Sequence, residues 1–317
     1  MNSLSNHRKA LTLHLAVIAV IFALHFVLPA YHHGILARVM VLSVLAMGYN
    51  IAFGYTGLLS LGHAIFFAAG MYGMGMSSIY WEFSPIPAVL FGVVVAFFVS
   101  LIVGALALRT AGVALMIVTL MFAQAGWYVI LYFGHLTRGD EGFVIPRTQR
   151  LIGSFDLSDS NNRYLVAAVV FAFALLVTLK LVQSAPGKVL VAIRENEERA
   201  QMLGYNVFRY KLMAVVVSGT LSGLAGACYG ILFGYVGATF ASVQYSILPL
   251  LWVLLGGAST VLGPFVGTYF MTYLIDISSE FTQAYLLVAG IVLVLLTLFA
   301  RQGIVGEIKK RIAPWLP

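Results

Sequence analysis

The chain has 317 residues, of which 61% are hydrophobic and only 9% are charged, and its mean hydropathy is +0.98. This composition excludes an ordinary soluble domain, which is about half apolar, and indicates a protein that lives in a bilayer. The formal net charge is +7, but the basic residues form no stripe interleaved with aromatic residues, so no nucleic-acid partner is expected. The single cysteine, Cys228, excludes a disulfide framework or a thiolate metal site.

Apolar runs approaching the length of about 20 residues needed to cross the hydrocarbon core recur along the whole chain. We therefore expect an all-α fold, a single transmembrane bundle over residues 1–317. The first run follows a basic start but has no clear cleavage site, so we interpret it as a retained span. The expected segments are residues 11–30, 35–53, 61–80, 85–108, 112–133, 164–182, 212–236, 246–257, 260–275 and 284–300.

The eighth segment, "SILPLLWVLLGG", is too short to cross a bilayer straight, and charge counting decides whether it crosses. With ten crossings and the N-terminus inside, 13 of the 18 lysines and arginines lie inside and 5 outside. With nine crossings, Arg301, Lys309, Lys310 and Arg311 move outside and the split becomes 9 to 9. Because basic residues concentrate in cytoplasmic loops, we expect ten crossings and two cytoplasmic termini. The short segment is then a broken or half-depth helix that lines a cavity.

Two polar stretches interrupt the apolar runs. Residues 134–163 form an outer, periplasmic loop with four arginines and four acids, which we expect to be well hydrated. Residues 183–211 form an inner, cytoplasmic loop that is rich in charge. The two loops are either binding surfaces for one partner on each side or merely solvated connectors.

Glycines recur at the four-residue spacing that lets helix backbones approach closely in lipid. Breaks such as "GGAST", residues 256–260, fit either tight packing or a gated pathway. The seven spaced glycines are Gly219, Gly223, Gly226, Gly230, Gly234, Gly263 and Gly267.

The segment "NIAFGYTGLLSLGHAIFFAAGMYGMG" groups small and polar residues at a helix start. Gly54 and Gly57 break the chain before Ser60, so exposed amides and the positive end of the helix dipole are placed to meet a carboxylate. The alternative is that Ser60 only caps the helix and His63 only bonds a neighbouring backbone group. The candidates for the translocation path are Ser60, Gly62, His63, Thr119, Gln124, Gly256 and Gly257.

The chain contains no enzyme motif. Lys188 follows a glycine, but Val182 stands where a P-loop needs its first glycine, so the chain binds no ATP by that route. The patterns H-E-x-x-H, C-x-x-C and G-x-S-x-G are also missing from the sequence. We therefore expect a chain that is not an enzyme and that carries no cofactor or metal.

The inner loop predicts one short helix with clear end signals. Pro186 and Gly187 are expected to end the preceding span. Asn196 is expected to cap a helix over residues 197–203, and Gly204 is suited to the position just after it. Glu195 precedes Arg199 by four residues, the favourable order for an ion pair.

This predicted helix has about two turns, with Ala200 and Leu203 expected on one side. Isolated helices below about 12 residues are marginal in water. The inner loop therefore needs something to dock into.

At these residues the sequence resembles the coupling loop of ABC importer permeases. Glu198, Ala200 and Gly204 match the first, third and last positions of the E-A-A-x-x-x-G pattern, with Arg199 at the second. Together with "GYTGLLSLGHAIFFAAGMYG", "LRTAGVALMIVTLMFAQ", "TRGDEGF" and "LLGGASTVLGPFVGT", the loop resembles the branched-chain amino acid permease family, M-type subunit, over nearly the whole chain.

The resemblance implies a bacterial inner-membrane subunit that pairs with a homologous H-type permease. It also implies two cytoplasmic ATPases, which carry the ATP and magnesium, and an extracytoplasmic substrate-binding protein. Residues carried over as the ATPase-coupling site are Glu195, Asn196, Glu197, Glu198, Arg199, Ala200, Leu203 and Gly204.

The leading hypothesis is thus an importer permease for branched-chain amino acids. The stretch "ATFASVQYSILPLLWV", with Pro249, departs from the family pattern, and the family includes urea and short-amide permeases, so these substrates remain an alternative. A stand-alone secondary transporter would need an acid at membrane depth, whereas Asp276 and Glu280 are expected at the outer edge.

Overall fold

The computed structural model describes residues 2–153, 155–300, 302–313 and 315; Met1, Arg301 and Pro317, on which part of the predicted topology rests, lie outside these ranges. The described residues form an all-α bundle, which confirms the expected fold class. The principal helices are α1 (Asn2–Leu24), α2 (Ala30–Asn50), α3 (His63–Tyr80), α4 (Pro85–Ala107), α5 (Val113–Tyr132), α7 (Ser160–Gln183), α10 (Val207–Phe233), α11 (Gln244–Gly256), α12 (Gly263–Phe281) and α13 (Tyr285–Phe299).

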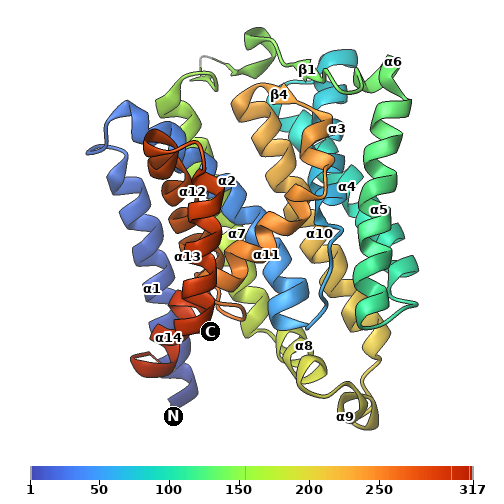
Figure 1. The fold of residues 1–317 in the computed structure, drawn as a ribbon, viewed down its shortest axis with the longest axis vertical. Helices are drawn as coiled ribbons and strands as arrows, with labels where there is room; N and C mark the ends of the chain where they lie inside the picture. Colours follow the sequence, from blue (N-terminus) through green and yellow to red (C-terminus); the bar gives the residue numbers. More distant parts are fainter. Residues whose placement is uncertain (1, 154, 301, 314, 316–317) are drawn as a thin grey trace.

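Short helices and strands lie at the two ends of the bundle. At the end we name the outer end lie α6 (Gly134–Thr137), β1 (Phe143–Val144) and β4 (Tyr235–Val236). At the opposite, inner end lie α8 (Ala185–Glu195), α9 (Glu197–Met202), α14 (Gly303–Arg311) and the start of α1 (Figure 1).

Six described helices are long and apolar enough to cross a membrane: α1, α2 extended by a π-helical turn, α4, α5, α7 and α10. The other four expected segments are helices too. Of these, α3 and α12 contain several polar residues, while α11 and α13 have only 13 and 15 residues. The chain is therefore polytopic, with four segments less apolar or shorter than a standard span.

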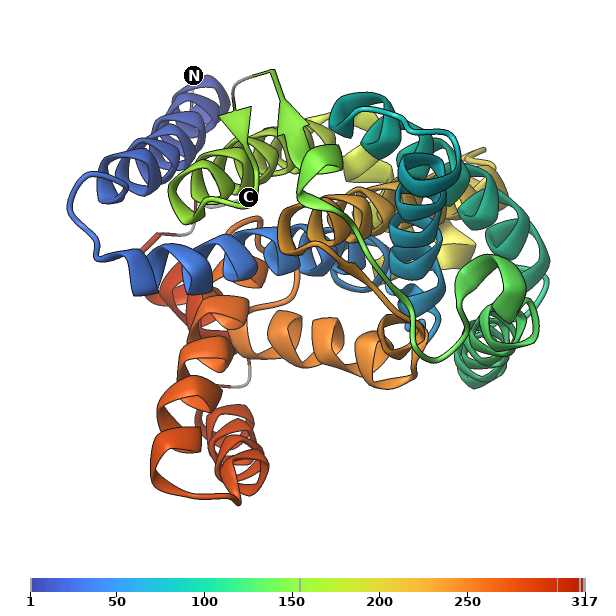
Figure 2. The ribbon, with the colours of Figure 1, turned by 90° about the horizontal axis from the view of Figure 1, so that it is seen from above.

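Helix α2 is the centre of the bundle, and α7, α10 and α12 pack around it (Figure 2). Helix α10 lies against α3 and α4 with almost no space between backbones. A Cβ atom at Gly226 would lie 1.9 Å from the carbonyl oxygen of Phe67, and one at Gly223 would lie 2.0 Å from Cβ of Ala96. The prediction that spaced glycines serve close helix packing is confirmed for these positions.

The expected break in the eighth segment lies elsewhere. Helix α11 continues through Pro249 as one helix of 13 residues, about 20 Å long, so the segment is short but not broken. The break instead follows α2, where a π-helical turn, η1 (Ile51–Tyr55), leads into an irregular stretch, and Gly57 adopts φ +76°. Helix α3 consequently begins only at His63.

The outer loop, expected to be well hydrated and called the outer segment below, keeps many exposed residues but also packs in part on the bundle. Strand β1 pairs antiparallel with β4, with Phe143 opposite Val236. Phe143, Ile145 and Leu157 are buried, and the Arg150 guanidinium donates hydrogen bonds to the last carbonyl oxygens of α10. Because the Asp159 side chain caps α7, that helix begins at Ser160, four residues earlier than expected.

The inner loop contains a helix that the sequence analysis missed. Pro186 and Gly187 do not end the preceding span but lie in the first turn of α8, whose Ser184 cap accepts a hydrogen bond from the Gly187 amide. Proline fits a first helical turn because no intrahelical donor is needed there. Helix α8 places the shorter α9 beyond the end of the bundle (Figure 1).

Candidate functional site

Helix α9 forms as its end signals predict. The Oδ1 atom of Asn196 accepts a hydrogen bond of 2.8 Å from the Arg199 amide, which satisfies an otherwise unpaired donor at the helix start. Gly204, at φ +87°, follows the last turn in a left-handed conformation that side chains disfavour. The helix ends at Met202, so Leu203 is the C-cap rather than the last helical residue.

The apolar residues of α9 do not share one side as expected. Ala200 is only 2% exposed and packs against Val189, Ile193 and Val207, which anchors the helix to α8 and α10. Leu203 is 75% exposed, and Met202 is 84% exposed. The expectation that Ala200 and Leu203 lie together was wrong, because the chain leaves the helix at Leu203.

The charged residues of the predicted coupling site, Glu195, Glu197, Glu198 and Arg199, are all exposed. Glu197 pairs with Lys211 at 2.6 Å from Oε2 to Nζ, which ties the start of α9 to α10. The expected ion pair between Glu195 and Arg199 is not among the ion pairs of the described residues. Glu197 and Lys211 form an ion pair in this loop instead.

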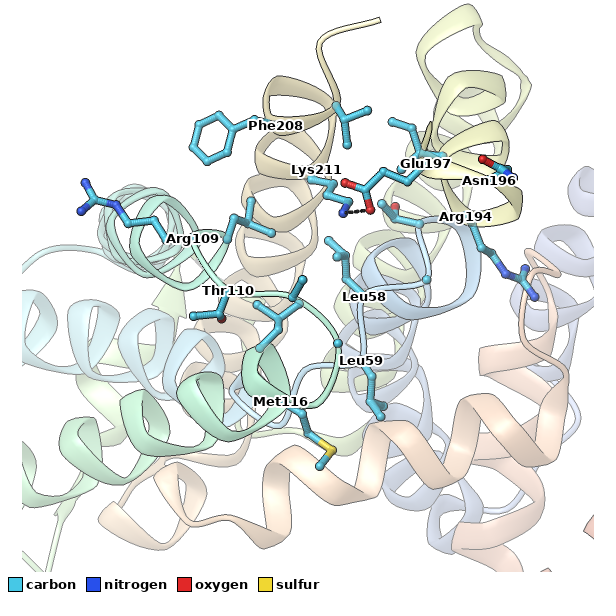
Figure 3. Close-up of a pocket in the computed structure, with 18 of the residues that line it drawn as sticks. Leu58, Leu59, Arg109, Thr110, Met116, Arg194, Asn196, Glu197, Phe208 and Lys211 are labelled. Atoms are coloured by element: carbon cyan, nitrogen blue, oxygen red, sulfur yellow. Dashed lines mark hydrogen bonds and ion pairs between the residues drawn. The ribbon is translucent and has the colours of Figure 1, made fainter. Parts of the chain in front are cut away.

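An open inner pocket of about 700 Å³ lies beside these residues (Figure 3). The Glu197–Lys211 pair lies on one side of it, and the irregular stretch after η1 forms another wall. The pocket thus lies between the inner loop and the chain that leads towards Ser60. Its lining includes Thr56, Leu58, Leu59, Arg109, Met116 and Phe208.

Arg194 links three elements at the inner end. Its guanidinium donates a hydrogen bond of 2.5 Å to the carbonyl oxygen of Gly54 in η1 and another to the hydroxyl of Ser259. The Ser259 hydroxyl itself donates to the Gly54 carbonyl at 2.6 Å. In Figure 3 the Arg194 side chain extends away from Lys211 and Glu197.

Asn50 completes this arrangement from the end of α2. Its side chain accepts a hydrogen bond of 3.1 Å from the Ser259 amide and donates one of 2.9 Å to the Thr260 carbonyl. The sequence analysis missed this cluster, although a lone amide at the end of an apolar span was a visible signal. We name Asn50, Gly54, Arg194, Ser259 and Thr260 the inner latch.

Three of the candidate path residues come together between α3 and α5. The Thr119 hydroxyl accepts a hydrogen bond of 3.1 Å from the Leu61 amide, and Ser60 accepts one of 3.2 Å from the Gly62 amide. A Cβ atom at Gly62 would lie 2.8 Å from the Thr119 carbonyl oxygen. In this conformation the amides expected to meet a carboxylate are therefore occupied.

The cavity lined by Ser60, His63 and Thr119 has a volume of only about 20 Å³, room for about one water molecule and not for an amino acid. Nearby, the Ser246 hydroxyl at the start of α11 accepts a hydrogen bond from the Ala64 amide. The contacts of α5 and α11 with the start of α3 thus hold this part of the bundle closed.

The remaining candidates occupy different surroundings. His63 is 2% exposed, its Nε2 lies 2.7 Å from the Ser218 hydroxyl, and its ring contacts Tyr49, so it is a packed core residue bonded to a side chain rather than to backbone. Gln124 is half-buried on α5. Gly256 and Gly257 lie beside the inner latch, where Cβ atoms would strike α12 and α14.

Apolar helices, six of which are long enough to cross a membrane, and a short helix that projects from the inner end define a polytopic membrane protein. The profile of the family described as branched-chain amino acid transport system / permease component matches residues 31–300. The chain therefore belongs to this family.

Individual relatives agree with the family. The chain is 26% identical to the high-affinity branched-chain amino acid transport system permease protein LivM of Salmonella typhimurium, over 92% of this chain and 73% of the relative. It is 27% identical to LivM of Escherichia coli, over 84% and 68%. Identity to the permease protein LivH of Salmonella typhimurium is 21%, over 84% and 91%. No solved structure matches the chain.

Proposed function

We propose that this permease subunit imports branched-chain amino acids and that partner ATPases drive it through α9. The observation that supports the coupling role is the exposure of Met202 and Leu203 at the end of α9, beyond the end of the bundle. Exposed apolar residues outside the lipid favour a protein partner. The proposed substrate class, branched-chain amino acids, is taken from the description of the family and from the names of the LivM relatives.

Movement of α9 has a short route to the translocation path. Ala200 anchors α9 to α8, and Arg194 at the end of α8 bonds Gly54. The stretch that follows Gly54 leads to Leu61, whose amide donates a hydrogen bond to the Thr119 hydroxyl of α5. A shift of α9 is therefore expected to move the irregular stretch before α3. Opening of the translocation path would require loss of the hydrogen bond to Thr119.

The partners are proposed from the family. They are an H-type permease, two cytoplasmic ATPases that hold ATP and magnesium, and an extracytoplasmic binding protein. The location is the bacterial inner membrane, with residues 183–211 and both termini in the cytoplasm and residues 134–163 in the periplasm. The excess of basic residues at the inner end supports this orientation.

Transport by the reconstituted importer tests the function. The permease pair, ATPases and binding protein in proteoliposomes should import leucine only with ATP. Import of urea with no import of leucine would show that urea, and not a branched-chain amino acid, is the substrate. Import by the permease without ATPases would identify a secondary transporter.

Labelling tests the orientation. In a Cys228→Ser background, Arg199→Cys in intact cells should resist a membrane-impermeant thiol reagent and react in inverted membrane vesicles. Reaction from outside would overturn the topology.

A further inference from the structure

Arg38 is the only charged residue in α2, the most buried of the candidate spans. Most residues of the span from Tyr31 to Tyr55 are buried, yet the Arg38 side chain is exposed. A charge within a membrane span is costly and rare unless it faces a cavity, a partner or a substrate pathway. Packing of α2 gives no reason for an arginine at this position.

The Arg38 guanidinium has no carboxylate partner among the described residues, whose ion pairs are Arg147–Asp156, Lys211–Glu197 and Arg311–Glu307. It lies instead over the ring of Phe233, with Cζ 5.6 Å from the ring centroid.

A second arginine approaches the same ring. The guanidinium carbon of Arg163, at the start of α7, lies 5.2 Å from the Phe233 centroid, and its buried Nε atom has no hydrogen-bond partner. Two positive charges thus converge on one aromatic ring near the outer end. Such a pair repels unless an anion joins it.

Aromatic rings from three elements continue from Phe233. Tyr229 lies 4.6 Å from Phe233 and 5.1 Å from Phe240 between centroids, and Phe240 lies 4.9 Å from Tyr245. The guanidinium of Arg38 therefore borders the partly exposed ring of Phe233, behind which Tyr229 and Phe240 are largely buried.

We propose that Arg38 binds the α-carboxylate of the amino acid as it enters from the outer end, with the apolar side chain of the amino acid on the partly exposed ring of Phe233, at the edge of the aromatic cluster. A guanidinium matches a carboxylate through two parallel hydrogen bonds, and aromatic faces also attract the substrate ammonium group. The inference rests on the proposed import function. It assigns the substrate class, because urea and short amides carry no anion to satisfy Arg38.

Leucine transport by the complete importer in proteoliposomes tests this site. Arg38→Gln should lower uptake at subsaturating leucine by about tenfold or more, the range expected for loss of a charged hydrogen-bonded contact. Arg38→Lys, which keeps the charge, should retain an intermediate rate. Assembly of the complex and ATPase activity without amino acid should be unchanged. Arg8→Gln removes an arginine from the distant start of α1 and serves as the matched control.

The outcomes separate this inference from the proposed function. Wild-type uptake by Arg38→Gln would overturn the carboxylate site while leaving the importer intact. Loss of assembly in Arg38→Gln with a wild-type leucine KM in Arg38→Lys would also overturn it, because Arg38 would then bind an acid of the partner permease or a lipid phosphate. Failure of the wild-type complex to import leucine would contradict the proposed function itself.

Discussion

The guanidinium of Arg194 and the carbonyl oxygen of Gly54 are joined by a hydrogen bond of 2.5 Å, although 140 residues separate them. This bond connects the last turn of α8 with the π-helical turn that ends α2. Such turns are rare and often lie at functional sites. The contact directly links α8, which carries α9, to the break before α3.

Arg194→Gln should uncouple ATP hydrolysis from transport. The variant loses charge-assisted hydrogen bonds to Gly54 and Ser259, each worth about 1.5–3 kcal/mol. Leucine uptake in proteoliposomes should fall about tenfold while ATPase activity persists. Lys188→Gln removes a charge from the same helix outside the latch and should transport normally. Equal uptake by Arg194→Gln and wild type would show that transport does not depend on the inner latch.

Gly204→Arg should prevent docking of the ATPases. No atom lies within 4 Å of a Cβ built at Gly204, so the long side chain points into the space that a partner would occupy. The matched control is Gly204→Asn, because asparagine tolerates the left-handed backbone. Co-purification of the ATPases should be lost with arginine and retained with asparagine. Intact assembly and ATP-driven uptake in Gly204→Arg would show that α9 is not the docking element.

Gly226→Ala should destabilise the bundle. The new methyl group would lie 1.9 Å from the Phe67 carbonyl oxygen, so α3 and α10 must separate at a cost of about 1–3 kcal/mol. Gly290→Ala places the same group where nothing lies within 4 Å. Thermal unfolding in detergent should show a lower midpoint for Gly226→Ala alone. A similar midpoint for both variants would contradict the close helix packing.

The outer segment should loosen in acid because of Asp156. The Ser158 amide, helped by Arg147, holds the pKa of the Asp156 carboxyl below its usual range. A carboxyl group whose folded pKa is depressed contributes stability above its unfolded pKa and loses it as the pH falls through the folded value. This contribution is therefore present at neutral pH and lost below about pH 4.

Asp156→Asn should accordingly raise amide exchange in residues 147–158 at neutral pH and change it little in strong acid. Asp140→Asn, an exposed acid of the same segment, is the control. Equal exchange in wild type and Asp156→Asn at neutral pH would show that this carboxylate does not order the segment.

The sequence by itself determined the bundle and the ends of its most exposed helix. Hydropathy placed the spans because lipid forces each one to satisfy its own backbone hydrogen bonds. Asn196 and Gly204 located α9 because cap preferences act over a few neighbouring residues.

Only the tertiary structure decided which polar residues meet. Asn50 lies 209 residues from Ser259, and Arg38 shares the Phe233 ring with Arg163, contacts that no local pattern encodes. Ala200 is buried and Leu203 exposed for the same reason, since the docking of α9 on α8 and α10 sets which residues of α9 remain accessible. Local chemistry forms the helices, but the packing of distant helices assembles the latch and positions its charges.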